Sequence, residues 1–281
     1  MDSPSERNFE TSAPSLSREE YVEQSYFFRA LRERTLEGYA TQEAIRLLIQ
    51  EILVTTKLPM AMDFLATELI RCGVIAPAMA TLSHYFTAFQ TFMIAEAERD
   101  EGRFDMRIAL EVLEKEAEYR AKGASVQGIF LYQLEVICRN RLGYDVGLAA
   151  VQKDTIFDET WREWIDVVRQ QIGFVDIADL IYVRSEYCWK RNGPQGKPAI
   201  FGEREGRIAW ATRRRDPVYL FSALSRQLGY PLVPRIKLPE QQEYRIQALE
   251  ARIHQLETRL KLVEEEKKGG IDLSQYYTKP E

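Results

Sequence analysis

The chain has 281 residues, of which 45% are hydrophobic and 29% are charged, and its formal net charge is −5. This composition fits one substantial globular domain with appendages and excludes a fibrous or wholly disordered chain. No apolar run approaches the length of a membrane span, so we expect no membrane partner.

The charge is distributed unevenly. Residues 184–237 contain twelve Lys and Arg against four Asp and Glu, whereas residues 1–183 contain nineteen against thirty. A basic segment on an acidic body can engage an anionic partner, and it can equally dock on its own acidic domain.

The cysteines and the N-terminal residues indicate the compartment. Cys72, Cys138 and Cys188 are widely spaced and include no CxxC pair. A chain of this length needs no disulfide staples, so we expect reduced thiols. Residues 1–16 are polar and are expected to be a disordered leader rather than a signal peptide. Together these features predict a cytoplasmic protein.

Helix signals begin at residue 17. Ser17 and Glu20 predict a capping box before an aromatic-rich helix, and a second helix is expected soon after it. Pro59 is expected near the start of a third helix that ends at Gly73. Pro77 is expected to open one long helix. Its apolar stripe comprises Leu82, Tyr85, Phe86, Phe89, Phe92 and Met93.

Further helices are expected up to residue 190, which completes a helical domain over residues 17–190. They cover residues 104–121, residues 126–142, a segment capped by Asp158 and residues 174–190. The last is apolar almost all round, so we expect it to be central. Eight or so helices in succession predict an all-α fold, either an antiparallel helical bundle or a short helical-hairpin stack.

Residues 191–238 are predicted to form a basic segment of different character. Apolar residues at 200–201 and 208–210 flank a stretch bounded by glycines, which predicts a small β-hairpin near residues 199–211. A short helix is then expected from Pro217, followed by a proline-rich connector.

Aromatic residues are interleaved with the basic side chains of this region. The basic side chains are Lys190, Arg191, Lys197, Arg204, Arg207, Arg213, Arg214 and Arg215. Arginines among aromatics can follow a phosphate backbone while they stack on bases, so this set is a candidate site for nucleic acid or another polyanion. Arginine also pairs with carboxylates, which the acidic body supplies.

Residues 239–268 carry a strict heptad repeat. The a and d positions are Ile246, Leu249, Ile253, Leu256, Leu260 and Val263. The g positions are Arg245, Arg252 and Arg259, and the e positions are Glu250, Glu257 and Glu264. In a parallel pair each g residue faces an e residue of the partner, so Arg meets Glu. The repeat therefore predicts a parallel coiled-coil homodimer; the alternative is a helix folded against its own domain. A flexible tail is expected over residues 269–281.

The sequence contains no catalytic or metal-binding signature. His84 and His254 are expected to face solvent, and neither has a Cys or carboxylate at metal-ligand spacing. Asp176, Asp179 and Glu186 are expected to pair with arginines rather than to perform acid–base chemistry. No metal and no cofactor are expected.

These patterns predict a non-enzymatic scaffold or adaptor that dimerises through its coil and binds a partner protein with its helical domain. The alternative is a nucleic-acid-binding protein that uses residues 189–215. An enzyme with a pocket in the helical bundle is a third hypothesis.

Overall fold

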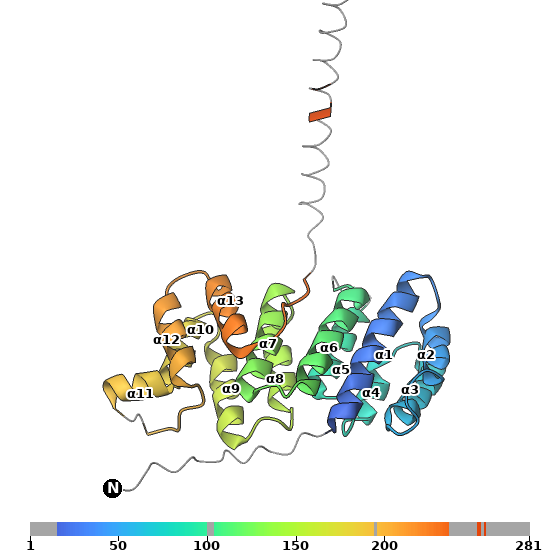
Figure 1. The fold of residues 1–281 in the computed structure, drawn as a ribbon, viewed down its shortest axis with the longest axis horizontal. Helices are drawn as coiled ribbons and strands as arrows, with labels where there is room; N and C mark the ends of the chain where they lie inside the picture. The colour runs from blue at the N-terminus through green and yellow to red at the C-terminus, as the bar shows by residue number, and fades with distance from the viewer. Residues whose placement is uncertain (1–15, 100–103, 194–195, 236–251, 254–255, 257–281) are drawn as a thin grey trace, which may run out of the picture. The chain divides into compact units, whose positions relative to one another are not determined.

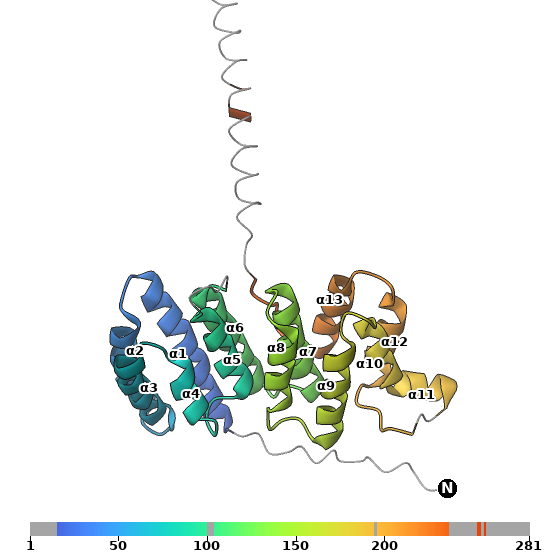
Figure 2. The same cartoon turned by 180° about the vertical axis from the view of Figure 1, so that it is seen from behind.

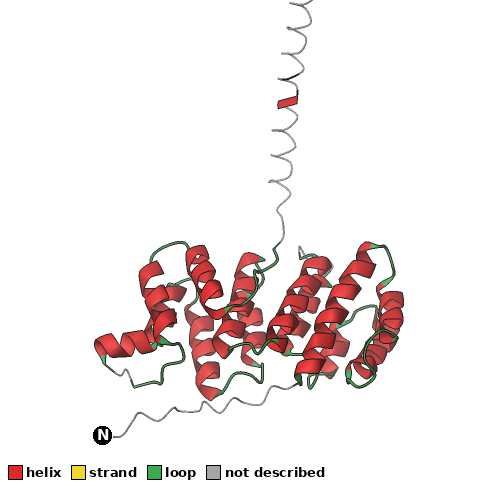
Figure 3. Cartoon of the chain, viewed as in Figure 1, coloured by secondary structure: helices red, strands yellow, loops and turns green. Residues whose placement is uncertain are grey.

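The computed structural model describes residues 16–99, 104–193, 196–235, 252–253 and 256. The described residues form thirteen α-helices and no β-strand, which confirms the all-α fold class (Figure 3). The chain divides into two compact units, Met1–Ile236 and Lys237–Glu281, and the thirteen helices belong to the first. No helix in the described ranges is long and apolar enough to cross a bilayer.

Six helices form the N-terminal part of this unit. They are α1 (Arg18–Leu36), α2 (Thr41–Ile49), α3 (Leu58–Cys72), α4 (Ala76–Thr81), α5 (Ala88–Ala97) and α6 (Met106–Ala121). Half of the predicted capping box at α1 is confirmed, because the Ser17 hydroxyl accepts a hydrogen bond from the Glu20 N–H at 3.4 Å, but the Glu20 side chain does not complete the box. The Glu20 carboxylate accepts from the Lys57 N–H and from the Tyr85 hydroxyl, each at 2.8 Å. Glu20 thereby fixes α1 to the chain before α3 and before α5.

The single long helix predicted from Pro77 is wrong. Helix α4 ends at Thr81, and α5 begins after Thr87, which forms a capping box with Gln90. The side-chain oxygen of Gln90 accepts from the Thr87 N–H, while the Thr87 hydroxyl accepts from the Gln90 N–H. These polar groups start a new helix although the apolar spacing continues across the break.

Seven helices complete the unit. They are α7 (Val126–Arg139), α8 (Tyr144–Gln152), α9 (Glu159–Gln171), α10 (Ile177–Val183), α11 (Glu186–Asn192), α12 (Glu203–Thr212) and α13 (Pro217–Leu228). The predicted cap of α9 is confirmed, because Asp158 accepts from the Trp161 N–H at 2.8 Å. Gly229 ends α13 with a φ of 72°, which is the left-handed conformation that favours glycine.

The single helix predicted over residues 174–190 is also wrong. A turn precedes α10, and α11 begins after Ser185, whose hydroxyl accepts from the Cys188 N–H at 3.2 Å. Val175 and Val183 are partly exposed. These residues therefore do not form the central helix that their composition predicts.

The β-hairpin predicted near residues 199–211 is wrong, because residues 203–212 form α12. The ring of Phe201 packs in the core, with its centroid 5.3 Å from that of Trp161. Gly206 lies inside α12 rather than in a turn. A Cβ atom at Gly206 would lie 2.2 Å from the Ser185 Oγ atom, so glycine permits the close approach of α12 to Ser185.

Ten of the helices of the first unit stand side by side in two layers, as two opposite views show (Figures 1 and 2). One layer contains α1, α6, α7, α13 and α12, and the other contains α4, α5, α8, α9 and α10. Large apolar side chains fill the space between them, including Phe28, Phe86, Phe89, Tyr132 and Trp164. The arrangement is the all-α packing of successive helices expected for this chain.

The segment after α13 folds back onto α6 and α7. The Tyr230 hydroxyl donates to the Glu135 carboxylate at 3.0 Å, and the Asn140 side chain donates to the Pro234 carbonyl at 3.0 Å. The Lys115 amine donates to the Leu232 carbonyl at 3.4 Å. Residues up to Arg235 are thus packed as part of the helical unit.

Candidate functional site

A groove with a volume of about 400 Å³ opens between α7, α8, the α9–α10 turn and the start of α13. Its lining residues are Leu134, Cys138, Tyr144, Ile172, Gly173, Phe174, Val175, Asp176, Ile177, Arg215, Pro217 and Phe221. Most of these side chains are aliphatic or aromatic. Pockets of this size and character commonly receive ligands or partner side chains. We refer to this set as the groove.

Phe174 lies at the rim of the groove and is 92% exposed. Gly173 adopts a φ of 91°, and the N–H groups of Phe174 and Val175 both donate to the Gln171 carbonyl at 3.0 Å. This tight turn holds a phenylalanine in solvent at the end of α9. A fully exposed aromatic residue beside an apolar groove is typical of a binding surface.

Asp176 and Arg215 are the charged members of the described groove lining. The Asp176 Oδ1 atom accepts from the Ala178 N–H at 3.0 Å, which caps α10. The Oδ2 atom accepts from the Arg214 N–H at 2.8 Å. Both oxygens of this carboxylate therefore hold the protein chain itself.

Two other groups of the groove can ionise, Cys138 and Tyr144. Burial raises the pKa of the Cys138 thiol to about 11 and the pKa of the Tyr144 phenol to about 12. Both groups are therefore neutral at physiological pH. Protonated groups of this kind supply neither a thiolate nucleophile nor a general base.

Four basic side chains of the 189–215 region form ion pairs. Lys190 and Arg207 both pair with Glu203, the latter at 2.9 Å. Lys197 pairs with Glu163 on α9 at 3.4 Å, and Arg213 pairs with Asp179 on α10 at 3.5 Å. Asp179 thus pairs with an arginine, as expected. The acidic body thus pairs with two of these basic side chains, Lys197 and Arg213, while Glu203 inside the segment pairs with the other two.

Two arginines of the same region stack on Trp210. The guanidinium carbon of Arg213 lies 3.2 Å from the centroid of the indole ring, and that of Arg191 lies 4.2 Å from it. Arg213 also lies 5.4 Å from the centroid of Tyr182. The side chains of Arg204, Arg214 and Arg215 are exposed. The structure therefore gathers only part of the predicted basic set at one place.

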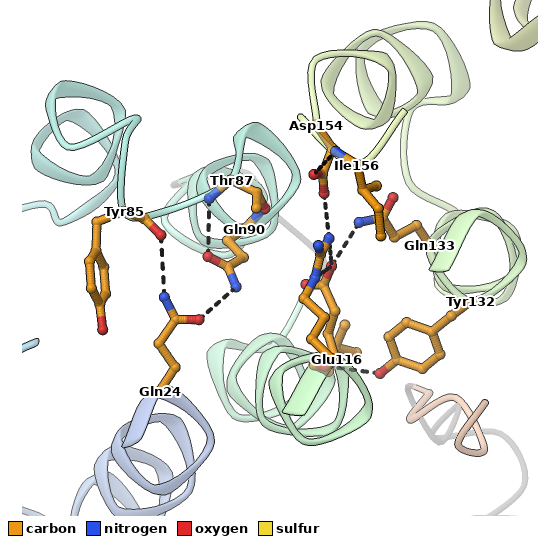
Figure 4. Close-up of polar contacts among 11 residues, drawn as sticks. Gln24, Tyr85, Thr87, Gln90, Glu116, Tyr132, Gln133, Asp154 and Ile156 are labelled. Carbon is orange, nitrogen blue, oxygen red and sulfur yellow. Dashed lines mark hydrogen bonds and ion pairs between the residues drawn. The ribbon is translucent and has the colours of Figure 1, made fainter. Parts of the chain in front are cut away.

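A buried polar network lies between α6, α7 and the chain after α8 (Figure 4). The Arg120 guanidinium binds both Glu116, at 2.9 Å, and Asp154, and the side-chain amide of Gln133 donates to Glu116 at 2.7 Å. All four side chains are buried. Burial raises the pKa of Glu116; the Asp154 charge adds to this effect and Arg120 opposes it. Because these four side chains are buried, they connect helices and cannot contact a substrate.

A second buried network joins α1 to α5. The Gln24 amide donates to the Tyr85 carbonyl, and the Gln90 amide donates to the Gln24 side-chain oxygen, both at 3.3 Å (Figure 4). Gln24 and Gln90 are completely buried. These bonds satisfy polar groups inside the core and fix the register of the two helices.

Metal ligands are not gathered in the part of the chain that the structure describes, where no three His, Cys, Asp or Glu side chains lie close enough to hold an ion. His84 is exposed. His254 lies outside the described residues.

Three of the predicted oligomerisation residues are described. Arg252, Ile253 and Leu256 are helical and exposed, Ile253 at 55% and Leu256 at 58%. The remaining members lie outside the described residues: Arg245, Ile246, Leu249, Glu250, Glu257, Arg259, Leu260, Val263 and Glu264. The predicted tail over 269–281 and residues 1–15 of the predicted leader also lie outside them. Leu16, the last residue of that leader, is buried.

Comparisons of the chain with protein-family models, with curated proteins and with solved structures found no match.

Sequence reasoning missed the groove because it assigned Phe174 and Val175 to a buried helix. The available signal was Gly173 directly after the amphipathic helix that Asp158 caps, since a glycine there ends the helix and exposes the next residues. The residues from α7, α8 and α13 are far apart in sequence, and only the tertiary fold brings them together.

Proposed function

We propose that this protein is a non-enzymatic adaptor. Its helical domain binds a partner protein in the groove, and its C-terminal heptads pair two copies in parallel. Two grooves on one particle raise the apparent affinity for a partner that is itself repeated or surface-bound.

The observation that carries the proposal is the exposure of Phe174 beside the groove. Phe174 is 92% exposed, and Tyr144 and Val175 in the same lining are 41% and 37% exposed, so together they form an apolar patch, which favours association. Aromatic residues in such positions are frequent binding hot spots, because a partner buries their whole apolar surface.

The chemistry of the groove supports binding over catalysis. Asp176 caps a helix and holds the Arg214 N–H. Cys138 and Tyr144 stay protonated at neutral pH. Asp176 is thus used to hold the chain, and the other two groups are protonated, which supports binding as the role of the groove.

The proposal includes a cytoplasmic location. It is based on the sequence, in which Cys72, Cys138 and Cys188 are widely spaced and include no CxxC pair. Cysteines of this pattern in a chain of this length are typical of a reducing compartment.

The experiment compares capture of cellular proteins by the wild-type chain and two matched variants. Phe174→Asp places a charge at the groove, whereas Val54→Asp changes a side chain that is 91% exposed on the α2–α3 connection. We expect Phe174→Asp to lose the captured partner and Val54→Asp to retain it. Equal capture by all three proteins would argue against the groove as the binding site.

Nucleic-acid binding by residues 189–215 is the second candidate. The exposed side chains of Arg204, Arg214 and Arg215 favour it, since exposed arginines can contact a phosphate backbone. Its test is titration with single-stranded and duplex nucleic acid at rising salt, with Arg213, Arg214 and Arg215 changed to Ala. Affinity that falls steeply with salt and with these changes would support this candidate, and no binding at low salt would remove it.

A further inference from the structure

We infer that the partner of the groove is an acidic amphipathic peptide segment, which places apolar side chains in the groove and a carboxylate on Arg215. This inference rests on the proposed function and specifies the chemistry of the partner. It follows from the apolar lining of the groove and from the exposed Arg215 guanidinium, which has no ion pair within the described residues.

The lining selects apolar side chains. Leu134 and Phe221 are buried at its base, Ile172 is half-buried, and Phe174 stands in solvent at the rim. A volume of about 400 Å³ is within the range of pockets that enclose ligands of roughly 300–1,000 Å³. Side chains projecting from one face of a short helix fit a site of this kind, because grooves between helices are a common place for amphipathic helices to bind.

The carboxylates around the groove are already engaged. Asp176 accepts two backbone hydrogen bonds. Asp216, next to Arg215, caps α13 by accepting from the Val218 N–H at 2.9 Å. Asp145 on α8 pairs with Arg169 at 2.9 Å. Each of these carboxylates therefore holds a group of the protein itself, although Asp176 and Asp216 keep their negative charge.

The three arginines at residues 213–215 differ in whether their side chains already have partners. Arg213 is turned away, because it stacks on Trp210 and pairs with Asp179. Arg214 and Arg215 are exposed, and their side chains make no ion pair within the described residues. The groove thus combines an apolar lining with one exposed guanidinium, that of Arg215, which has no ion pair within the described residues. A partner that is complementary to both must supply a carboxylate beside its apolar anchors.

The test begins with a selection. A phage-displayed library of random peptides of about 16 residues is selected on the full-length protein. We expect the enriched peptides to combine Leu, Ile, Phe or Trp at helical spacing with Asp or Glu. Enrichment of neutral or basic peptides would overturn the inference.

The strongest peptide is then labelled, and its affinity is measured by fluorescence anisotropy. Arg215→Glu should weaken binding about tenfold or more, and a peptide with Lys in place of its acidic residue should recover affinity for that variant. Arg226→Glu is the matched control, because Arg226 is exposed on α13 outside the groove lining. It should bind the original peptide as the wild type does.

The Phe174→Asp variant distinguishes two errors: a wrong chemistry for the partner, and a wrong binding site. Loss of binding on Phe174→Asp with no change on Arg215→Glu would overturn the acidic preference and leave the groove as the binding site. Peptides that bind equally to wild type and Phe174→Asp, or no enriched peptide at all, would overturn both.

An unlabelled single-stranded oligonucleotide serves as competitor in the same assay. We expect it to leave the bound peptide in place. Displacement that depends on Arg215 would overturn the inference in favour of a polyanion. Phe174→Ser, measured beside Phe174→Asp, and equal thermal unfolding of all variants show that changes in affinity do not come from misfolding.

Discussion

The backbone N–H of Arg214 donates to the Oδ2 atom of Asp176 at 2.8 Å. This bond ties the connection between α12 and α13 to the first turn of α10, and it shapes one edge of the groove. The same carboxylate caps α10 through its other oxygen. One side chain thus stabilises a helix and a tertiary contact together.

Asp176→Ala should cost more stability than the loss of an ordinary helix cap. Removal of a cap costs about 1 kcal/mol, and the loss of a further hydrogen bond adds about 1 kcal/mol. Asp216→Ala is the matched control, because Asp216 caps α13 through a bond to the Val218 N–H. Urea unfolding of both variants gives the comparison. Equal destabilisation would show that the Arg214 contact contributes nothing.

Gly206→Ala should destabilise the protein by about 1–3 kcal/mol, the usual cost of forcing an extra methyl group into a packed site. The new Cβ atom would lie 2.2 Å from the Ser185 Oγ atom and 2.5 Å from its Cβ atom. Gly143→Ala is the control, since Gly143 has a φ of −62° and a Cβ atom there would have no heavy atom within 4 Å beyond its chain neighbours. We expect it to change the free energy of unfolding by less than about 0.5 kcal/mol. Similar effects of the two substitutions in chemical denaturation would contradict the packing described for α12.

Glu116 should make stability depend on pH. Burial raises its pKa above the usual Glu value, so the folded state holds this proton more tightly than the unfolded chain does. Its contribution to stability is complete below the unfolded pKa and is lost as the pH rises through the folded pKa.

In the wild type, the free energy of unfolding should fall as the pH rises from the unfolded pKa of Glu116 to its folded pKa. Glu116→Gln should make this fall smaller. Urea unfolding at a series of pH values measures the decline, and Glu118→Gln, on an exposed side chain of the same helix, is the control. If the free energy of unfolding of Glu116→Gln falls with pH as steeply as that of the wild type, the buried carboxyl is ionised at every pH measured.

The features of the fold that could be predicted are helix ends, because the residues that form them are close together in the sequence. Ser17, Asp158 and Gly229 each act within a turn of their own helix, so short sequence windows carry the signal. The apolar stripes also predicted the all-α fold, and most of their residues are buried in the structure.

The remaining features depend on contacts that are distant in the sequence. The end of α4 and the start of α5 interrupt an apolar run, and Ser185 divides another. Gly206 marks a close helix contact rather than a turn, and a glycine alone does not distinguish the two. Phe174 is of a residue type that is usually buried, and only the turn at Gly173 places it in solvent. The groove could not be predicted because its walls come from helices that meet only in the folded unit.

The C-terminal heptads should make the full chain a dimer, and truncation after Pro239 should give a monomer. In a parallel pair each Arg at g faces a Glu at e, so changing Arg245, Arg252 and Arg259 to Glu makes every such pair repulsive. Light scattering at matched concentrations measures the mass of the three proteins. A charge-reversed chain that stays as dimeric as the wild type would contradict the parallel register.

The central claim, that the groove receives a partner protein, is tested most directly by cross-linking from its rim. A photo-activated phenylalanine analogue replaces Phe174 in one chain and Val54 in another, two positions that are almost equally exposed. After irradiation in cells, mass spectrometry of the cross-linked products is predicted to find a distinct protein joined to position 174 and absent from position 54. The same products at both positions, or no product at position 174, would contradict the claim.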